Sequence, residues 1–424
     1  MVESFKKISV FIIFGCCLAY YPDYNAIVTG IPYPAKLIIH SMSSTNPHLG
    51  ILNSDLSMYW NVNHGENGFD FRKNNEQLSY FNKDNNFWLI VDEYMQEVDT
   101  LQCANNMKTD YHDIRLLDNG GHILQCYDSI WVNLEFHTPQ LIKDILIIQE
   151  FDNQNNLILN WNALDYLSID DYPNLDPTSP IITFMHANSI EIDNDNNLLI
   201  SNRTSDEVFK INRITGEIIW ILGGPQNEFT FINDPLNGFN KQHDVRRINN
   251  GNITLFDNGT LHEPMLSRAL EYQLDEINKT ATLVWEYIHP DSVVAMSMGS
   301  VQRLPNNNTL INWGFYFDTF IINSGTFISE VDYEKNVVME LTYPIGYYAY
   351  RARKDIWDFS INVLPGDTNV DGIINVLDVI YTVNYILNLA NHSVKLFDAH
   401  KVDLNTDGVM DILDITIMIN SIID

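Results

Sequence analysis

Short alternating runs of apolar and polar residues, broken by turn residues, cover most of the chain up to residue 341. Four segments share one pattern, a short strand, an Asn, Asp or Gly turn and a second strand, over residues 111–120, 186–194, 242–251 and 299–307. This pattern predicts β-hairpins. Further strand-like runs follow at residues 157–161, 217–220, 281–285 and 337–341. Because the sequence has no long helical periodicity before residue 376, we expect an all-β domain.

The hairpins recur at a regular interval, since His186 to His243 and His243 to Ser300 are both steps of 57 residues. Four-stranded units of roughly 40 to 55 residues, repeated around a ring, are typical of a β-propeller. Five units are recognisable, of which 68–100 is the faintest, and the remaining segments 26–60 and 347–363 could close a sixth blade. We therefore predict a six-bladed β-propeller over residues 20–363, with five or seven blades as alternatives.

The last sixty residues carry a different pattern, in which Asp-x-Asn-x-Asp-Gly occurs twice, 36 residues apart. Oxygen ligands at loop positions 1, 3, 5 and 12, with Gly at position 6, are what a short loop needs to surround Ca²⁺. One copy could be a simple Asx-turn, but two copies, each followed by an apolar run of helical length, predict two calcium ions. The predicted ligands are Asp367, Asn369, Asp371, the carbonyl of Ile373, Asp378, Asp403, Asn405, Asp407, the carbonyl of Val409 and Asp414.

This pair of loops and helices, over residues 364–424, resembles a type I dockerin, a small all-α module with Asp at position 12 of each loop. The resemblance implies that the module attaches a secreted protein to a cohesin-type partner. Loop positions 10 and 11, which help to select the cohesin and are often hydroxylated, are Val376-Leu377 and Ile412-Leu413 here. A role within this chain or an unfamiliar partner therefore stays open.

The N-terminus has the features of an export signal. Lys6 and Lys7 precede an apolar run over residues 8–19 and then a polar stretch, which predicts a signal peptide at residues 1–19. The run is too short to span a bilayer, and no other segment of the sequence suggests a transmembrane helix. Cleavage near Ala19 has lipidation at Cys16 as its alternative. We expect a secreted or cell-surface protein, with a periplasmic or lipid-anchored location as variants.

Two cysteines, Cys103 and Cys126, remain once the signal is removed, and an even number in an exported protein favours a disulfide over two free thiols. The formal net charge of −31 argues against nucleic acid and anionic membranes as partners. The sequence contains no G-x-x-x-x-G-K-[ST] loop, so we expect no nucleotide cofactor.

Within the predicted propeller, His112, His186 and His243 lie at near-equivalent positions in three hairpins, with His186 displaced by one residue. Equivalent positions on inner strands converge on the axis of a propeller, so we expect the imidazoles to meet, with irregular backbone at His186. Arg203 ends the strand that follows the His186 hairpin, and it could point to the same place or form a surface ion pair. Imidazoles, an amide and an arginine suit an oxyanion-binding site. The next position of the repeat is polar in every unit: Asp113, Asn188, Asp244 and Ser300.

Residues from about 22 to 363 resemble the secreted arylsulfotransferases, a family that moves sulfate between phenols without a nucleotide donor. The resemblance rests on ordered motifs: Tyr111-His112-Asp113, Asn160-Trp161-Asn162-Ala163-Leu164-Asp165, His186-Ala187-Asn188-Ser189, Ser201-Asn202-Arg203, Thr215-Gly216-Glu217-Ile218-Ile219-Trp220-Ile221-Leu222-Gly223-Gly224, Gln242-His243-Asp244, Leu255-Phe256-Asp257-Asn258-Gly259 and Ser267-Arg268-Ala269. The fold of this family is a six-bladed propeller, which agrees with the repeats.

The resemblance implies that His243 is the nucleophile and that His112, His186, Asn188 and Arg203 hold the sulfuryl oxygens. It also implies a phenolic sulfate donor, a phenol acceptor and a sulfohistidine intermediate. A neutral imidazole, available above about pH 6.5, can displace a phenolate from sulfur. Two other functions agree with the same residues: hydrolysis of aryl sulfates by water, and non-catalytic ligand binding by a propeller displayed through its dockerin. The residues of the acceptor pocket cannot be identified from the sequence.

Overall fold

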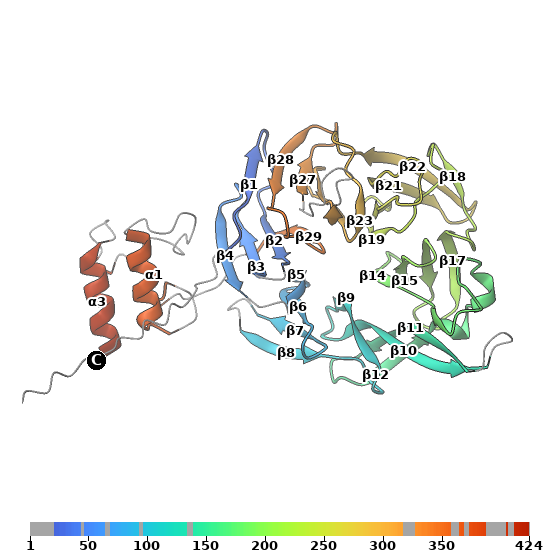
Figure 1. Cartoon of the computed structure of the whole chain (residues 1–424), viewed down its shortest axis with the longest axis horizontal. Helices are drawn as coiled ribbons and strands as arrows, with labels where there is room; N and C mark the ends of the chain where they lie inside the picture. Colours follow the sequence, from blue (N-terminus) through green and yellow to red (C-terminus); the bar gives the residue numbers. More distant parts are fainter. Residues whose placement is uncertain are drawn as a thin grey trace, which may run out of the picture.

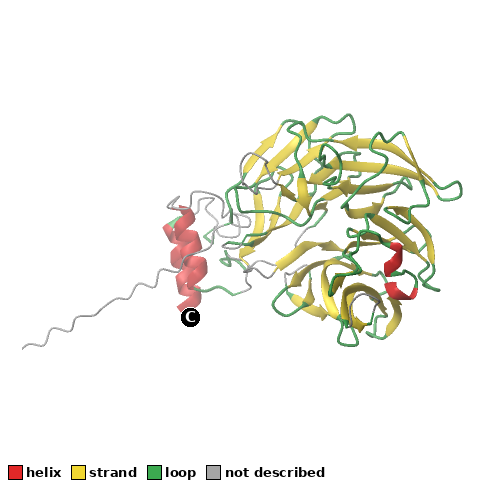
Figure 2. Ribbon diagram, turned by 45° about the vertical axis from the view of Figure 1, so that its right-hand side comes forward, coloured by secondary structure: helices red, strands yellow, loops and turns green. Residues whose placement is uncertain are grey.

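The computed structural model describes residues 21–43, 46–63, 68–92, 96–133, 139–316, 327–357, 364–368, 373–386, 404–405 and 411–423. The predicted signal peptide at residues 1–19, with Cys16, lies outside the described residues. Six sheets of four or five strands surround a common axis (Figure 1; Figure 2). The prediction of a six-bladed β-propeller is confirmed.

Each blade is a stack of antiparallel strands whose innermost strand lies nearest the axis (Figure 1). From the innermost strand outward, the first three blades are β29 (Ala352–Asp355), β2 (Lys36–Ser41), β3 (His48–Leu52) and β4 (Met58–Asn63); β5 (Gly68–Asn74), β6 (Gln77–Asn82), β7 (Phe87–Val91) and β8 (Glu97–Leu101); β9 (Lys108–Leu116), β10 (His122–Val132), β11 (Gln140–Phe151) and β12 (Leu157–Asn162). The last three are β14 (Ala187–Ile192), β15 (Leu198–Asn202), β16 (Glu207–Ile211) and β17 (Ile218–Gly223); β19 (His243–Arg247), β20 (Ile253–Asp257), β21 (Arg268–Asp275) and β22 (Thr280–Tyr287); β24 (Ser300–Arg303), β25 (Thr309–Asn312), β27 (Phe327–Val331) and β28 (Val337–Thr342).

A few short elements decorate this ring. Two strands pair in parallel with outer strands, β13 (Ile181–Thr183) with β11 and β18 (Thr230–Ile232) with β22. A separate two-stranded sheet joins β23 (Ala295–Ser297) to β26 (Phe315–Tyr316). Two 3₁₀ turns, η2 (Ala163–Asp165) and η3 (Ile169–Asp171), follow β12.

The two ends of the propeller sequence close the ring. The C-terminal strand β29 pairs with β2, so that segments 26–60 and 347–363 do share the first blade, as the sequence predicts. The N-terminal part of the first segment behaves differently. Strand β1 (Asn25–Val28) pairs with β28 and becomes the outermost strand of the sixth blade. The chain therefore links its first and last blades twice, once at the axis and once at the rim.

Buried tryptophans join neighbouring blades. The indole N–H of Trp88 donates to the carbonyl of Asp110, and that of Trp161 donates to the carbonyl of Gly216, each in the next blade. Trp285 bonds the Tyr333 carbonyl of the sixth blade in the same way. Each ring thus buries a large apolar surface and also satisfies its single polar group, which keeps the cost of burial low.

Along the axis, one buried guanidinium binds strands of several blades. Arg351, just before β29, donates to the Asp70 carboxylate of β5, to the His112 carbonyl of β9, to the Asn188 carbonyl of β14 and to the Asp244 carboxylate of β19. Arg351 is 3% exposed, so these bonds form in a medium of low dielectric, where charge-assisted hydrogen bonds are strong. A side chain of the first blade therefore fixes the positions of the next four inner strands.

Two helices follow the propeller, α1 (Val376–Ile386) and α3 (Ile412–Ile423), where the sequence predicts apolar helices. They pack side by side in both views (Figure 1; Figure 2), with the fully buried Met418 of α3 among Ile374, Val379 and Leu404. Neither helix is long and apolar enough to cross a bilayer, nor is any other in the described part of the chain.

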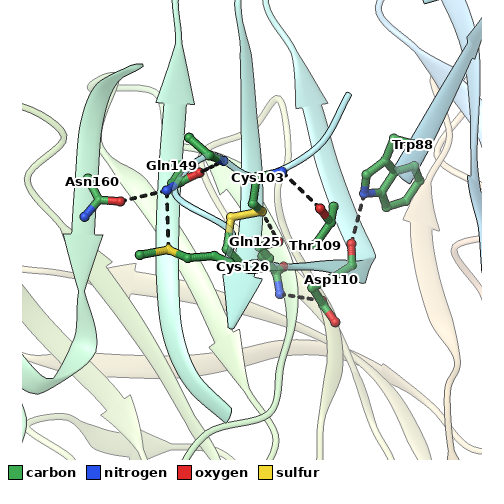
Figure 3. The surroundings of a disulfide bond; sticks show 10 residues. Trp88, Cys103, Thr109, Asp110, Gln125, Cys126, Gln149 and Asn160 are labelled. Atoms are coloured by element: carbon green, nitrogen blue, oxygen red, sulfur yellow. Dashed lines mark hydrogen bonds between the residues drawn. A yellow bond between two sulfur atoms is a disulfide. The ribbon is translucent and has the colours of Figure 1, made fainter. Parts of the chain in front are cut away.

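The expected disulfide is present. Cys103, in the connection from the second blade to the third, bonds Cys126 of β10 (Figure 3). Nearby polar side chains are tied to the same strands: the Cys103 N–H donates to the Thr109 hydroxyl, and Gln125 donates to the Asp110 carboxylate. The bond thereby holds the connection close to the start of β9, the strand that carries His112.

Replacing both Cys103 and Cys126 by Ala should lower the free energy of unfolding by about 3 kcal/mol, because the bond closes a loop across 23 residues of sequence. Denaturant unfolding of the oxidised wild type and of the double variant measures the difference. The reduced wild type serves as the control, since it loses the bond but keeps both side chains. A loss below about 1 kcal/mol in both would contradict a stabilising role.

Candidate functional site

The three predicted histidines line one cavity of about 310 Å³, here called the histidine cavity. His112 lies on β9, His243 is the first residue of β19 and His186 directly precedes β14. The ring centroids of His112 and His186 are 4.6 Å apart, and both His112 and His243 have edge-to-face contacts with Tyr350. Equivalent positions of three blades thus meet near the axis, and Arg203, after β15, reaches the same cavity.

The backbone beside His186 is irregular, as expected. The register of β14 against β15 shifts between Ala187 and Ser189, which marks a β-bulge. The alignment of the hairpins, however, is wrong by one residue in this blade. Turn-closing bonds from an N–H to the carbonyl four residues later define the equivalent positions: Leu117 to Gly121, Asp193 to Asn197, Ile248 to Asn252 and Leu304 to Asn308. Counting back from Asp193, the counterpart of Asp113, Asp244 and Ser300 is Ser189 rather than Asn188.

The side chains at this corrected position connect neighbouring inner strands. Each accepts a hydrogen bond from a backbone N–H of the next blade: Asp113 from Ile190, Ser189 from Val245, Asp244 from Val301 and Ser300 from Ala352. The polar residue at this repeat position is therefore mainly structural. These hydrogen bonds between blades explain why the positions are polar although they are buried.

The ring of His243 is fixed in one tautomer by its partners. Its Nδ1 lies 2.6 Å from Oδ1 of Asn258, whose Nδ2 donates to the carbonyls of Ala295 and Met298. Because the amide nitrogen is held by two carbonyls, the amide oxygen must face the ring, and Nδ1 carries the proton. The Met298 N–H lies 3.3 Å from Nε2, which agrees with a lone pair on that nitrogen.

His243 is also kept neutral. Burial, followed by the positive charge of Arg203, lowers its pKa to about 3, although the bond to Asn258 opposes the shift. A pKa near 3 leaves the imidazole unprotonated throughout the physiological range. His243 is therefore a neutral base or nucleophile whose reactive atom is Nε2.

His112 has a carboxylate partner instead. Its Nδ1 lies 2.9 Å from both oxygens of Asp110, and Asp110 also accepts from the His112 N–H and from Gln125. These bonds fix the ring orientation and place a proton on Nδ1. The ring stacks on Tyr111 at 4.1 Å. His112 and His243 are thus held by different groups, one anionic and one neutral.

His186 and Arg203 are neighbours through their backbones, because the Arg203 N–H donates to the His186 carbonyl at 2.8 Å. Burial and the nearby His112 lower the pKa of His186 well below its usual value, so this ring is also neutral. Arg203 donates from Nη2 to the Met296 carbonyl, and its buried Nε has no hydrogen-bond partner among the described residues. Since Arg203 forms no ion pair with a described residue, it lines the cavity rather than forming a surface ion pair.

Asn188 does not line the histidine cavity. Its fully buried amide donates to the Gln242 carbonyl at 2.7 Å, and its own carbonyl accepts from Tyr350 and Arg351. Of the five predicted site residues, the structure therefore brings four to the cavity and places the fifth in the layer that supports it.

Eight further residues complete the wall, most of them apolar or aromatic, and sequence analysis assigned none of them to the site. The remaining lining residues are Met42, Phe69, Lys83, Tyr111, Ser297, Met298, Tyr348 and Tyr350. Tyr111 stands within a recognised motif, next to His112, so adjacency could have indicated it. The same holds for Asn258, which lies inside the Leu255–Gly259 motif. Tyr348 and Tyr350 come from the segment that precedes β29, the strand that closes the ring, and only the fold brings them to the other residues.

The two predicted calcium loops share one arrangement in their described residues. The buried carboxylate at position 12 accepts from loop backbone in both: Asp378 from Thr368 and Asn375, Asp414 from Leu404, Asn405 and Asp411. Asp367 is buried as well. The predicted ligands Asn369, Asp371, Asp403, Asp407 and Val409 lie outside the described residues, within which no cluster of three or more metal-binding side chains occurs.

Comparison with known families gives two matches. The model described as Arylsulfotransferase (ASST) matches residues 52–351, and that of the Dockerin type I domain matches residues 365–423. A search of the curated proteins finds no match.

Among solved structures, a protein of unknown function from Bacteroides caccae has 12% identity and a TM-score of 0.48, covering 76% of this chain and 99% of its own. Catalytically inactive virginiamycin B lyase from Staphylococcus aureus has 8% identity and a TM-score of 0.37, over 76% and 99%. The Cps50 β-propeller domain of Myceliophteria thermophila has 9% identity and a TM-score of 0.42, over 74% and 87%.

Replacing Asn258 by Asp should raise the pKa of His243 from about 3 by roughly 1 to 3 units, because a negative charge beside Nδ1 favours the protonated ring. NMR titration of ¹⁵N-histidine-labelled protein measures the shift, with the His243 signals assigned by their loss in a His243→Asn variant. Asn160→Asp is the matched control, since it adds the same charge at an exposed position of β12 and keeps the acceptor oxygen that Gln149 binds. An unchanged His243 titration in Asn258→Asp would show that Asn258 does not set the state of this ring.

Proposed function

Because the chain belongs to the arylsulfotransferase family, we propose that its propeller moves a sulfuryl group from an aryl sulfate to a phenol through His243. The observation that carries the proposal is the state of His243. It is a buried neutral imidazole with Nδ1–H fixed by Asn258, and it borders a cavity that also holds Arg203 and two further histidines. A neutral nitrogen nucleophile beside a cation suits attack on an anionic sulfate ester.

In the first step, the Nε2 lone pair of His243 attacks sulfur and gives up its long bond to the Met298 N–H. An N–S bond forms, the S–O bond to the aryl group breaks, and the electron pair leaves on a phenolate that takes up a proton from solvent. The parent phenol has a pKa near 10, so the phenolate is an acceptable leaving group. Nδ1–H stays bonded to Asn258, which orients the ring that now carries positive charge.

In the second step, the oxygen of an acceptor phenol attacks the same sulfur. An O–S bond forms, the N–S bond breaks, and the phenolic proton passes to solvent, which restores neutral His243. Splitting the transfer in two requires the first phenol to leave before the second reacts, a ping-pong cycle. Neither step needs a nucleotide.

The negative charge on the sulfuryl oxygens needs cations or hydrogen-bond donors to stabilise it. The predicted site residues differ in how they can do this. Two cations line the cavity, Lys83 and Arg203, and the Nε of Arg203 has no hydrogen-bond partner among the described residues. His112 faces the same cavity, with its ring held by Asp110. His186 completes the predicted clamp. Asn188 acts indirectly, because its carbonyl positions Tyr350, which lines the cavity, and Arg351, which lies behind the lining.

The wall of the cavity suits an aromatic substrate. Phe69, Tyr111, Tyr348 and Tyr350 present ring surface, with Tyr111 and Tyr350 both packed on Phe69 at 4.6 Å. Stacked and edge-to-face contacts with such rings favour a phenyl group over an aliphatic chain. This wall supports aryl sulfates and phenols as the donor and acceptor.

We further propose that the chain divides into a signal peptide at residues 1–19, the propeller at 20–363 and the dockerin at 364–424, and that it acts outside the cell. Asp367, Asp378, Asn405 and Asp414, with the other predicted ligands, would hold two Ca²⁺ ions, which suit all-oxygen loops. The equal backbone bonds of Asp378 and Asp414 support a matched pair of loops. A cohesin-type protein is the expected partner.

Release of 4-nitrophenol from 4-nitrophenyl sulfate, with and without a second phenol and with no nucleotide added, tests the reaction. We expect the acceptor to accelerate release by wild type and His243→Asn to slow it at least on the order of a thousandfold, since the nucleophile is lost. His122→Asn is the control, because His122 stacks on Phe151 outside the cavity.

Three results would contradict parts of this proposal. Release that no phenol accelerates would indicate a hydrolase. Equal rates in wild type and His243→Asn would exclude His243 as the nucleophile. Failure of wild type to turn over a range of aryl sulfates would favour a ligand-binding propeller.

Removal of calcium with EDTA should unfold the dockerin and leave turnover by the propeller within about twofold, because metal binding to such loops is coupled to their folding. Circular dichroism follows loss of the helical signal of α1 and α3, and the aryl sulfate assay follows the propeller. Adding calcium back should restore the helices. A helical signal that EDTA does not alter would argue against calcium in these loops.

A further inference from the structure

A second cavity, of about 500 Å³, lies at the other end of the inner strands, and we call it the far-end cavity. Each inner strand that lines it begins at or near the histidine cavity and ends here. On β9 the chain passes from His112 to Arg115, and on β19 it passes from His243 to Arg246 and Arg247. The buried layer around Arg351 lies between the two cavities.

The far-end cavity gathers positive charge in a strongly acidic protein. Seven of the 24 Lys and Arg residues of the chain line it: Arg72, Lys73, Arg115, Arg246, Arg247, Arg303 and Arg353. Three carboxylates, Glu191, Glu271 and Asp355, share the lining, so its formal charge is 7 − 3 = +4, whereas the whole chain carries −31. A concave site with one sign of charge concentrates ions of the opposite sign.

Each of these seven cations already pairs with a carboxylate, and Arg115 does so with Glu191 of the same lining. Arg246 and Arg72 bind the buried Asp113, and Arg247 binds Asp193. Although burial raises it, the guanidinium groups of Arg246 and Arg72 hold the pKa of Asp113 well below its usual value, so this carboxylate is charged. Such pairs fix the guanidinium groups rigidly and leave their remaining edges for a ligand.

The hydrogen bonds of the guanidinium groups in the far-end cavity are incomplete at Arg353. Its Nη2 binds both oxygens of Asp244, but its Nη1 is buried and has no hydrogen-bond partner among the described residues. Arg353 is 8% exposed, so more than nine-tenths of it is buried. The Thr254 hydroxyl, also in the lining, is a second buried group with no described partner. Buried donors without partners are rare because each costs free energy, and an acceptor oxygen in the cavity would remove that cost.

We propose that the far-end cavity binds an oxyanion of the sulfate or phosphate class, free or on a small organic body, with Arg353, Lys73 and Arg115 as its main contacts. The volume exceeds what a single inorganic ion fills and falls in the range of small-ligand sites. Tyr333 lies in the wall, where Arg303 stacks on it at 5.1 Å, and it offers a flat surface to an organic body. This site does not depend on the proposed transfer reaction, since it requires only binding.

Isothermal titration of the full chain with sodium sulfate, against sodium chloride at equal ionic strength, tests the proposal. An Arg203→Gln background weakens binding in the histidine cavity, so that the remaining sulfate site is the far-end one. We expect one saturable sulfate site in this background. Titration with glucose 6-sulfate, with glucose as the uncharged control, then distinguishes a free ion from a sulfated organic ligand, because tighter binding than inorganic sulfate would identify the latter.

Two variants locate the site. Arg353→Lys keeps a cation beside Asp244 but removes the unpartnered Nη1, and it should weaken sulfate binding at least fivefold. Lys73→Gln should also weaken sulfate binding. It should disturb the fold less than Arg353→Lys, because the Lys73 ammonium contacts the exposed Glu76, the Ile356 carbonyl and the Trp357 ring. Lys279→Gln is the matched control, since it removes an equal charge beside Glu228, away from the cavity.

Sulfate that binds no better than chloride would overturn the proposal. So would unchanged affinity in both Arg353→Lys and Lys73→Gln, which would place the site elsewhere. If Arg353→Lys does not fold, the comparison of Lys73→Gln with Lys279→Gln decides alone.

Discussion

The propeller depends on the buried guanidinium of Arg351. A ring of six sheets has no single hydrophobic core, because each blade packs only on its two neighbours. The axis is where all blades come close, and there the inner strands expose backbone carbonyls and carboxylates rather than apolar side chains. Arg351 gathers these acceptors from four blades at once. Breaking a buried charged network of this kind typically costs more than losing one apolar contact, since its partners would stay buried without compensation.

The same network adds to the effects that keep His243 neutral: burial and then Arg203 lower the pKa of this ring most, and Arg351 makes a smaller contribution. Four guanidinium groups, those of Arg72, Arg246, Arg351 and Arg353, face three carboxylates, Asp70, Asp113 and Asp244, so the axis carries a formal charge of 4 − 3 = +1. A positive interior opposes protonation of a buried imidazole, and Arg203 adds to it from the cavity side. The acidic surface of the protein is therefore no guide to the electrostatics of its centre.

Much of the fold could be predicted from the sequence because its signals are local. Hairpins, turn residues and a 57-residue interval are visible without three-dimensional information, and they located the inner strands that carry His112, His186 and His243. The error at Asn188 arose where a β-bulge and the choice of turn residue changed the count. Asn258 lies inside a recognised motif and Asp110 directly precedes one. Their roles depend on hydrogen bonds to the histidine rings, which residue spacing alone does not reveal. Tyr350, and the seven cations of the far-end cavity, come together only through closure of the ring.

Closure by β29 also decides how the protein bears mechanical load. The chain leaves the propeller from the innermost strand of the first blade, whose last residue, Asp355, borders the far-end cavity. Tension from an anchor at the C-terminal module therefore enters the fold at the strand that is held by β2, by Arg351 and by the buried Lys354–Glu330 ion pair, rather than at a loosely held rim strand. The pull is also applied at the opposite end of the inner strands from the histidine cavity. A molecule held this way would be pulled on a strand that is hydrogen-bonded within the ring and not on a strand at its edge.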